Sequence, residues 1–356
     1  MHHGVYFVGA DHQRGGLQMK HLNFKALATA AIFGMGLTGQ AAHADEASYI
    51  LATASTGGTY YPVGVAISTL VKVKLQPKQK ISMAAINSAG SGENVRLLRE
   101  DEAQFAILQG LFGYYAASGT GPLENEGPQK DLRSVTMLWQ NVEHFAVASD
   151  AVKTGNMDDF LALKGQEIAI GKKNSGTIGS NTAILSGLGV SADEDYSLMH
   201  AGYGPSAEAL QNGQVEGIST PAGVPVGAVS QMMATMGDGV KLLDFTDAQL
   251  AKADGGRDLW TRYVIPTGTY PGQTADVNTI AQPNFLAVRS DLSDENVYLI
   301  TKAIYENLPF LQAIHPATKA MAIEKAIAGL PLPLHPGAAR YYQEVGVTIP
   351  DRLIAK

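Results

Sequence analysis

The sequence predicts an α/β fold in which two α/β lobes are joined by crossing strands, and three observations lead to this class. Short runs rich in β-branched and aromatic residues alternate with helical patterns, which is typical of βαβ units with mainly parallel sheets. The chain has 356 residues, and because one domain usually holds roughly 100–200 residues, this length suits two domains. No low-complexity linker separates a first series of elements from a second series that begins near Gly165. That absence favours lobes connected by shared strands over independent domains.

The first series of elements alternates strands and helices. Its strands are predicted over residues 49–54, 81–86, 105–108, 135–139 and 144–148, and its helices over residues 62–75 and 94–100. In the first helix, Val63, Ile67 and Leu70 recur on one face, at the spacing of a helix with one buried side.

The second series has the same character. Strands are predicted over residues 168–170, 215–219 and 280–288, and helices over residues 178–188, 206–210 and 226–235. A long helix is predicted to open at Ser293, because serine caps helices and Asp294 and Glu295 in the first turn suit the helix dipole. Pro309 is expected to stop this helix.

Composition excludes several classes of protein. About 45% of the residues are hydrophobic, which is enough to fill real cores and rules out wholesale disorder. The formal net charge is -7 with acids and bases scattered, so no basic stripe is offered to a nucleic acid. The absence of cysteine removes disulfides, thiol chemistry and thiolate metal sites.

The amino-terminal region has the pattern of a cleaved signal peptide starting near Met19. Lys20 and Lys25 precede an apolar run over residues 26–37, and the small residues of Ala42-His43-Ala44 form a cleavage site. We expect cleavage after Ala44, with residues 1–18 as upstream sequence, and export to the periplasm; a buried amphipathic first helix is the alternative. No later stretch approaches 18 consecutive apolar residues, so the mature chain is expected not to be embedded in a membrane.

A turn rich in glycine and hydroxyl groups recurs three times, each time between a predicted strand and a predicted helix. Helix amino termini leave N–H groups unpaired and carry partial positive charge, so such turns are ready anion sites. Turns at the carboxyl ends of strands line the crevice where open α/β sheets bind ligands. The expected ligand-binding residues of the three turns are Ser55, Thr56, Gly57, Gly58, Thr59, Tyr60; Ser88, Gly90, Ser91, Asn94; and Asn174, Ser175, Gly176, Thr177.

Further residues at strand ends are expected to line the same crevice, namely Gln109, Pro221, Ala222 and Gly223. For each turn taken alone, helix capping explains the serine, threonine and glycine equally well. The threefold recurrence favours anion binding. His144, inside an apolar strand, is expected to be a satisfied core histidine, and Lys172 and Lys173 to lie at the rim of the crevice.

Motifs for catalysis or cofactors do not occur in the sequence. There is no GxxxxGK[ST], and Gly90-Ser91-Gly92 lacks the third glycine of GxGxxG. No HExxH or GxSxG is present. We therefore expect no catalytic residue, no cofactor and no bound metal, although an enzyme assembled across the fold stays open as an alternative.

Nine motifs follow one another in order over nearly the whole predicted mature chain. They are TASTGGTYYPVG (53–64), NSAGSGENVRLL (87–98), FAILQ (105–109), LWQNVEHFAV (138–147), NSGT (174–177), SAEALQNGQVEG (206–217), IPTGTYPGQ (265–273), VYLITKAIYEN (297–307) and PLHPGAARYYQEVG (333–346). Together these motifs resemble the TAXI family, the periplasmic receptors of tripartite ATP-independent periplasmic (TRAP) transporters.

The resemblance implies a type II periplasmic-binding-protein fold that closes on its ligand. Lobe 1 would comprise residues 45–145 and 283–356, and lobe 2 residues 146–282. Family ligands are small carboxylates such as glutamate or 2-oxoglutarate, and the partners are the TRAP transporter membrane subunits. Relatives often have Gly-Ser-Gly-Thr where this chain has Asn174-Ser175-Gly176-Thr177, which bears on ligand preference. The receptor is expected to be a monomer. A sensor that docks on a receptor kinase is the competing function.

Overall fold

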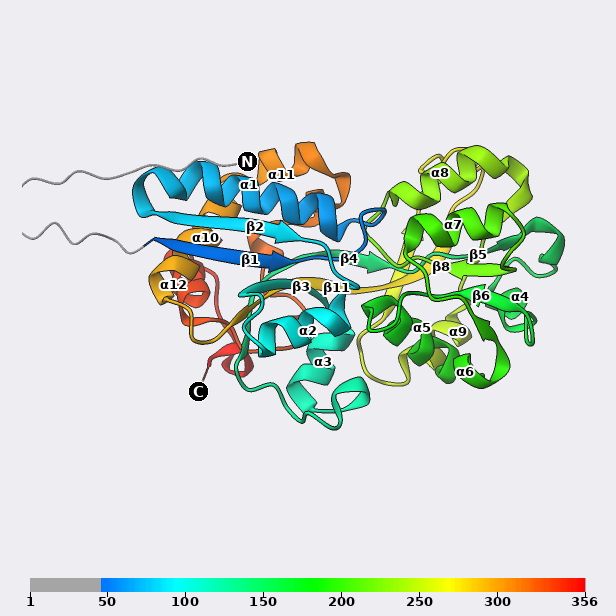
Figure 1. Ribbon diagram of the computed structural model, residues 1–356, viewed down its shortest axis with the longest axis horizontal. Coiled ribbons are helices and arrows are strands. Elements are labelled where there is room, and N and C mark those ends of the chain that lie inside the picture. Colours follow the sequence, from blue (N-terminus) through cyan, green and yellow to red (C-terminus); the bar gives the residue numbers. More distant parts are fainter. Residues whose placement is uncertain (1–45, 356) are drawn as a thin grey trace, which may run out of the picture. The chain divides into compact units, whose positions relative to one another are not determined.

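The computed structural model describes residues 46–355, in which two β-sheets form the centres of two lobes (Figure 1). The predicted signal peptide lies outside the described residues. Within residues 46–355, no helix has both the length and the apolar composition that a membrane crossing needs.

The first sheet has the strand order β10-β11-β3-β1-β2, and β4 also pairs with β11. β1 runs parallel to β2 and β3, whereas β11 is antiparallel to β3, β4 and β10. Its strands are β1 (Ala47–Ala52), β2 (Ile81–Ile86), β3 (Phe105–Gln109), β4 (Leu132–Val142), β10 (Thr261–Ile265) and β11 (Val277–Arg289).

Helices pack on this first sheet through apolar faces. α1 buries Val63, Ile67, Leu70 and Val71, as its sequence spacing predicts, and packs on β2. The helices of the first lobe are α1 (Tyr60–Gln79), α2 (Ser91–Arg99), α3 (Gly110–Ser118), α10 (Asp294–Glu306), α11 (Leu308–Ile314) and α12 (Pro336–Glu344).

The second sheet has the order β7-β6-β8-β5-β9 and separates two apolar cores. Alternate residues of β5 supply them: Phe145 and Val147 face one core and Ala146 faces the other. The strands are β5 (Phe145–Ala148), β6 (Glu167–Ala169), β7 (Ser197–Leu198), β8 (Gly217–Ser219) and β9 (Val240–Leu242).

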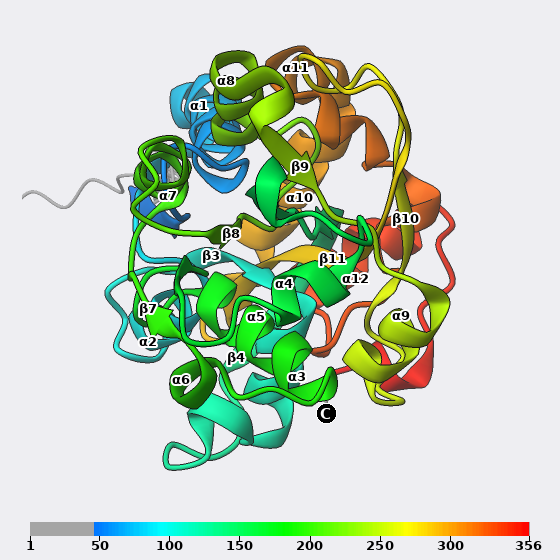
Figure 2. The same cartoon turned by 90° about the vertical axis from the view of Figure 1, so that its right-hand side faces the viewer.

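The helices of the second lobe lie on both faces of this sheet. Figures 1 and 2 show α7 and α8 above the strands and α5, α6 and α9 below them. These helices are α4 (Met157–Leu161), α5 (Gly176–Gly187), α6 (Ala192–Asp195), α7 (Tyr203–Gln211), α8 (Gly227–Met236) and α9 (Asp247–Asp254).

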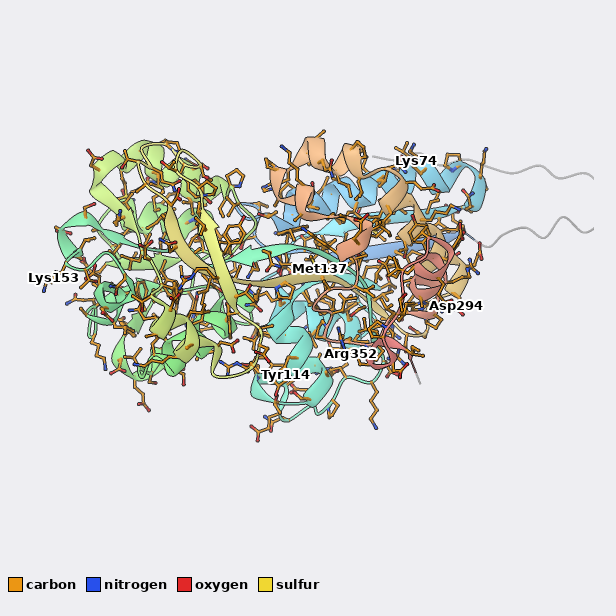
Figure 3. All side chains as sticks on the ribbon, turned by 180° about the vertical axis from the view of Figure 1, so that it is seen from behind. Lys74, Tyr114, Met137, Lys153, Asp294 and Arg352 are labelled. Atoms are coloured by element: carbon orange, nitrogen blue, oxygen red, sulfur yellow. The ribbon has the colours of Figure 1, made fainter. Side chains whose placement is uncertain are left out.

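The long strands β4 and β11 connect the lobes. They pair antiparallel from Arg289↔Leu132 to Ala281↔Val142, and the chain enters the second sheet directly after β4, at Phe145. Figure 3 shows β4, with Met137 labelled, running from the first lobe toward the second. The predicted fold class, two α/β lobes joined by crossing strands, is confirmed.

The structure confirms the predicted limits of α10 and corrects several helix starts. α10 is capped by the Ser293 hydroxyl and ends at Glu306, just before Pro309, as predicted. Pro309 lies in the first turn of the next helix, α11, where its missing N–H would have no partner anyway. By contrast, α1, α2 and α5 begin two to three residues before the predicted positions, inside the polar turns.

We predict that Phe160→Ala destabilises the second lobe strongly. Phe160 is fully buried, and its ring meets that of Phe145 edge-on with centroids 4.9 Å apart. Truncating a buried phenylalanine costs about 3–5 kcal/mol of unfolding free energy, because contacts are lost and a cavity remains. Chemical denaturation measures this cost, with Val264→Ala at a more exposed position as the control. Equal midpoints for the two variants would contradict this packing.

Candidate ligand-binding site

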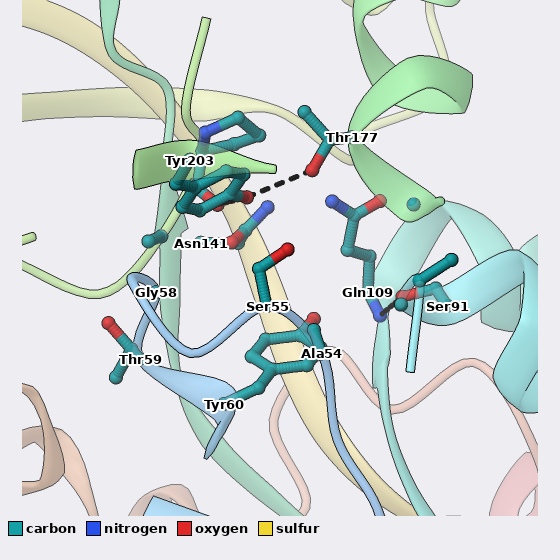
Figure 4. A pocket seen from close by; sticks show the side chains of 15 residues that line it. Ala54, Ser55, Gly58, Thr59, Tyr60, Ser91, Gln109, Asn141, Thr177 and Tyr203 are labelled. Atoms are coloured by element: carbon teal, nitrogen blue, oxygen red, sulfur yellow. Dashed lines mark hydrogen bonds between the residues drawn. The ribbon is translucent and has the colours of Figure 1, made fainter. Parts of the chain in front are cut away.

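A cavity of about 30 Å³ lies where strand ends of the first lobe meet helix starts of both lobes. This is room for at least one water molecule, so in this conformation the cavity is small. Figure 4 shows its lining side chains. The lining residues are Ala54, Ser55, Gly58, Thr59, Tyr60, Ala89, Gly90, Ser91, Gln109, Asn141, Gly176, Thr177, Tyr203, Pro221 and Ala222.

Several helices begin at the wall of this cavity. α1 begins at Tyr60, α2 at Ser91, α5 at Gly176 and α7 at Tyr203, and each of these residues lines the cavity. N–H groups in the first turn of a helix have no partner within that helix, and the dipole adds partial positive charge. The cavity wall is therefore electropositive without a basic side chain.

Gly90 shows how a turn delivers such N–H groups. It precedes α2 with φ of +122°, a conformation that glycine adopts readily, and no side chain caps the helix there. The backbone N–H groups at the start of α2 are therefore left without a side-chain cap next to the cavity.

Hydroxyl groups contribute a second set of polar contacts. The hydroxyls of Thr177 and Tyr203 lie 2.9 Å apart (Figure 4), and the Tyr203 hydroxyl donates to Pro221 O. Since Tyr203 donates to this carbonyl, Thr177 is the donor to Tyr203. The hydroxyl of Ser91 accepts from Gln109 N at 3.0 Å.

Two amide side chains at the cavity have unpaired atoms. Gln109 Oε1 and Asn141 Nδ2 are both buried, and neither has a hydrogen-bond partner within residues 46–355. A buried polar atom without a partner costs free energy, which a ligand can recover by completing the hydrogen bond.

Among the described residues that line the cavity, none carries a formal charge. The part of the chain that the structure describes also contains no cluster of three or more potential metal-binding side chains. The arrangement can therefore hold an anion by hydrogen bonds and helix dipoles, without an ion pair.

Glu143 and His144 lie in the chain between β4 and β5, shortly after the lining residue Asn141. Burial raises the pKa of the Glu143 carboxyl to about 8, opposed by a hydrogen bond that Trp260 Nε1 donates to it. Burial likewise lowers the pKa of His144 to about 4. The His144 ring is satisfied by Val142 O at 2.8 Å and the Tyr270 hydroxyl at 2.7 Å, as expected for a core histidine. Both groups are therefore mainly neutral near pH 7.

Many of the residues expected to bind ligand do line this cavity together. They come from all three glycine-rich turns and from the ends of two further strands. They are Ser55, Gly58, Thr59, Tyr60, Gly90, Ser91, Gln109, Gly176, Thr177, Pro221 and Ala222.

Other expected residues lie next to the cavity but do not line it. Thr56 is exposed, and Gly57 packs closely on Gly204 N. Asn94 donates to Thr53 O and Ile107 O at 2.8 and 2.9 Å, and so holds strand ends together. Its Oδ1 accepts from the Ser88 hydroxyl at 2.6 Å. These side chains therefore stabilise the turns.

The rest of the third turn and Gly223 also face elsewhere. The Ser175 hydroxyl caps α5 by accepting from Ile178 N at 3.0 Å. Ser175, Asn174 and Lys173 line a separate cavity of about 560 Å³. Gly223 packs so tightly that an added Cβ would lie 2.6 Å from the Trp139 ring.

Four lining residues were not predicted from the sequence, namely Ala54, Ala89, Asn141 and Tyr203. Asn141 lies within the LWQNVEHFAV motif, which was the available signal. Tyr203 is the first residue of α7, three residues before the predicted helix start. Its place at a helix amino terminus was therefore not predicted.

Two seams join the lobes on either side of the cavity. At the first, Glu93 N donates to Asn174 O at 2.8 Å, and a Cβ on the neighbouring Gly92 would lie only 2.5 Å from that oxygen. At the second, Ala228 N donates to Gly57 O at 3.3 Å and Thr59 Oγ1 to Gly223 O at 2.8 Å. These contacts hold the lobes closed over the cavity.

Comparisons with known proteins identify a family and a fold. The model of the NMT1-like family matches residues 51–346. The malate-bound MatC protein from Rhodopseudomonas palustris has a TM-score of 0.53 at 15% identity, over 84% of this chain and 98% of that chain. At this identity the likeness shows a shared fold.

Two further solved structures show weaker likeness. The alkanesulfonate-binding protein SsuA from Xanthomonas axonopodis pv. citri, bound to MOPS, has a TM-score of 0.43 at 14% identity, over 84% of this chain and 91% of that chain. A binding protein component of an ABC phosphonate transporter from Pseudomonas aeruginosa has a TM-score of 0.47 at 11% identity, over 76% and 78% of the two chains.

We predict that Glu143→Gln changes how stability depends on pH. Between about pH 4.5 and pH 8 the folded chain keeps a proton that the unfolded chain releases, so the wild-type free energy of unfolding falls as pH rises. The variant has no carboxyl at position 143, so it lacks this contribution to the pH dependence of stability. Its stability relative to wild type should therefore improve from pH 5 to pH 8 by up to about 1.4 kcal/mol per pH unit. Urea titrations at several pH values measure this difference, and parallel curves would contradict it.

Proposed function

Since the chain belongs to the NMT1-like family, we propose that it is a periplasmic solute-binding receptor of the TAXI type, which captures a small carboxylate for a TRAP transporter. The carboxylate is of the glutamate or 2-oxoglutarate class. The observation that carries the proposal is the uncharged cavity on which helix amino termini from both lobes converge.

This cavity suits a small anion for a physical reason. A carboxylate transferred from water needs its charge matched by several hydrogen bonds, because burying an unpaired charge is very costly. First-turn N–H groups of α2 and α5 and the hydroxyl of Ser91 supply such donors. The Thr177 hydroxyl joins them when its proton turns from Tyr203 to the ligand. Neutral donors of this kind hold the anion firmly yet let it leave when the lobes separate.

Capture requires the lobes to open. The cavity is small and the two seams close it, so a solute enters only when contacts such as Glu93 N to Asn174 O are broken. Bending at the crossing strands β4 and β11 would separate the lobes with little change inside each one. The proposed lobes are residues 45–145 with 283–356, and residues 146–282.

Location and partner rest on sequence motifs. The signal-peptide pattern over residues 19–44 supports the periplasm, and the motifs shared with the TAXI family support a TRAP membrane partner. MatC was solved with malate bound, so this fold accommodates a small carboxylate in at least one other protein.

Calorimetry on the chain from Asp45 to Lys356 tests the proposed ligand class. L-Glutamate and 2-oxoglutarate should bind with a stoichiometry of one, whereas the uncharged dimethyl ester of 2-oxoglutarate should not bind. Tight binding of the ester, or the failure of all small carboxylates, would overturn the proposal.

We predict that Ser91→Ala and Thr177→Ala each weaken binding of the carboxylate about tenfold to a hundredfold. A hydrogen bond to a charged group is worth roughly 1.5–3 kcal/mol, and 1.4 kcal/mol corresponds to one decade of affinity. Lys172→Ala and Lys173→Ala should change affinity only modestly and mainly at low salt, because neither lysine lines the cavity. Normal binding by both alanine variants, with binding abolished in a lysine variant, would replace this account with an ion pair.

We also predict that Gly92→Ala opposes closure. Its new Cβ would meet Asn174 O at 2.5 Å, so the first seam would have to separate. Affinity should fall by about tenfold or more, since part of the binding free energy must then offset the strain. Small-angle scattering with saturating 2-oxoglutarate should show a smaller radius of gyration for wild type than for the variant.

Gly204→Ala is the matched control for this experiment. Gly204 lies at the second seam, but a Cβ there would meet no atom within 4 Å. This variant should close and bind like wild type. If Gly92→Ala also compacts fully and binds normally, the seam does not limit closure.

A further inference from the structure

The buried amide of Asn141 is aimed into the cavity from strand β4. Its side chain is only 1% exposed, it lines the cavity, and its Nδ2 has no hydrogen-bond partner among the described residues. Figure 4 shows this nitrogen on the side that faces Thr177 and Gln109. An amide offers either a donor or an acceptor, so its orientation decides which ligand atoms it accepts.

A relay of hydrogen bonds fixes that orientation, and it begins at the buried hydroxyl of Tyr60. Burial raises the pKa of this hydroxyl, so the hydroxyl keeps its proton and can donate a hydrogen bond.

From Tyr60 the relay runs through Asn284 on β11. The Tyr60 hydroxyl donates to Asn284 Oδ1, which leaves Asn284 Nδ2 to donate to Asn141 Oδ1 at 3.5 Å. Because the oxygen of Asn141 is engaged by this donor, its nitrogen faces the cavity. Asn284 does not line the cavity, so it acts on a ligand only through Asn141.

Burial makes the relay hard to reverse. Asn141 and Asn284 are at most 1% exposed, and Tyr60 is 7% exposed. Turning the Asn141 amide would set two donors or two acceptors against each other without water to separate them.

We propose that Asn141 contacts the ligand and selects it by donating to a carboxylate or carbonyl oxygen, and that Asn284 and Tyr60 are positioning residues for its amide. The proposal rests on the proposed function, since it assigns a role within the same cavity. It goes further in one respect: a ligand nitrogen that can only donate, such as an ammonium group, is excluded from the Asn141 side of the cavity.

Calorimetry with 2-oxoglutarate and L-glutamate tests whether Asn141 donates a hydrogen bond to the ligand. Asn141→Leu, of similar size, should weaken binding about tenfold to a hundredfold, the loss expected for a hydrogen bond to a charged oxygen. At pH 8, Asn141→Asp should weaken binding further, because an ionised carboxylate has no proton to donate. Binding by Asn141→Asp that equals or exceeds wild type would overturn the proposal.

A double-variant cycle tests the positioning role. Asn284→Leu should weaken binding about tenfold although it does not touch the ligand, and Asn141→Leu with Asn284→Leu should bind no worse than Asn141→Leu alone. Strict additivity of the two losses would contradict the relay. Asn181→Leu is the control: Asn181 is a buried asparagine that bonds Ile170 O and Ser219 and does not line the cavity, so it should lose stability but not affinity.

The two proposals fail separately. If the wild-type chain binds neither compound, the carboxylate class proposed above is wrong. The relay is then tested without ligand, by the side-chain amide resonances of protein labelled with 15N-asparagine. Asn284→Leu should shift and broaden the Asn141 pair while Asn181→Leu leaves it in place. An Asn141 pair that Asn284→Leu does not change would overturn the relay.

Discussion

The convergence of helix amino termini on one uncharged cavity is the interaction on which the rest of the structure depends. α1 and α2 come from the first lobe, and α5 and α7 from the second. Bringing these partial positive charges together is unfavourable unless an anion lies between them. Each lobe alone supplies only part of the donor set. Under the proposed function, the free energy of binding therefore depends on the lobes being closed.

Glycines allow the lobes to approach closely enough for this. Gly92 lets the backbone of α2 reach Asn174 O, and Gly57 lets the first turn reach Gly204 and Ala228. Behind these seams, the buried amides of Asn141 and Asn284 lie on the strands that cross between the lobes. The same strands thus connect the lobes and carry the side chains at the back of the cavity, so a bend there changes both together.

The sequence predicts best what depends on local chemistry. Glycines and hydroxyls between a strand and a helix identify Ser91, Gly176 and Thr177, because turn and cap preferences are set by neighbouring residues. Asn141 and Tyr203 are missed because their direction depends on strand pairing and lobe packing far along the chain. Asn174 was predicted to line the cavity but does not. It lies in a correctly predicted turn with a left-handed backbone, φ of +61°, and its carbonyl oxygen accepts a hydrogen bond from Glu93 N.

Mass spectrometry of the compound released from protein purified from its native cells tests the proposed ligand class most directly. The account predicts one small carboxylate, present at close to one molecule per chain, that rebinds to the emptied protein. A stoichiometric ligand that is uncharged or cationic would contradict the account, because converging helix amino termini with no acidic side chain at the cavity do not favour such a compound.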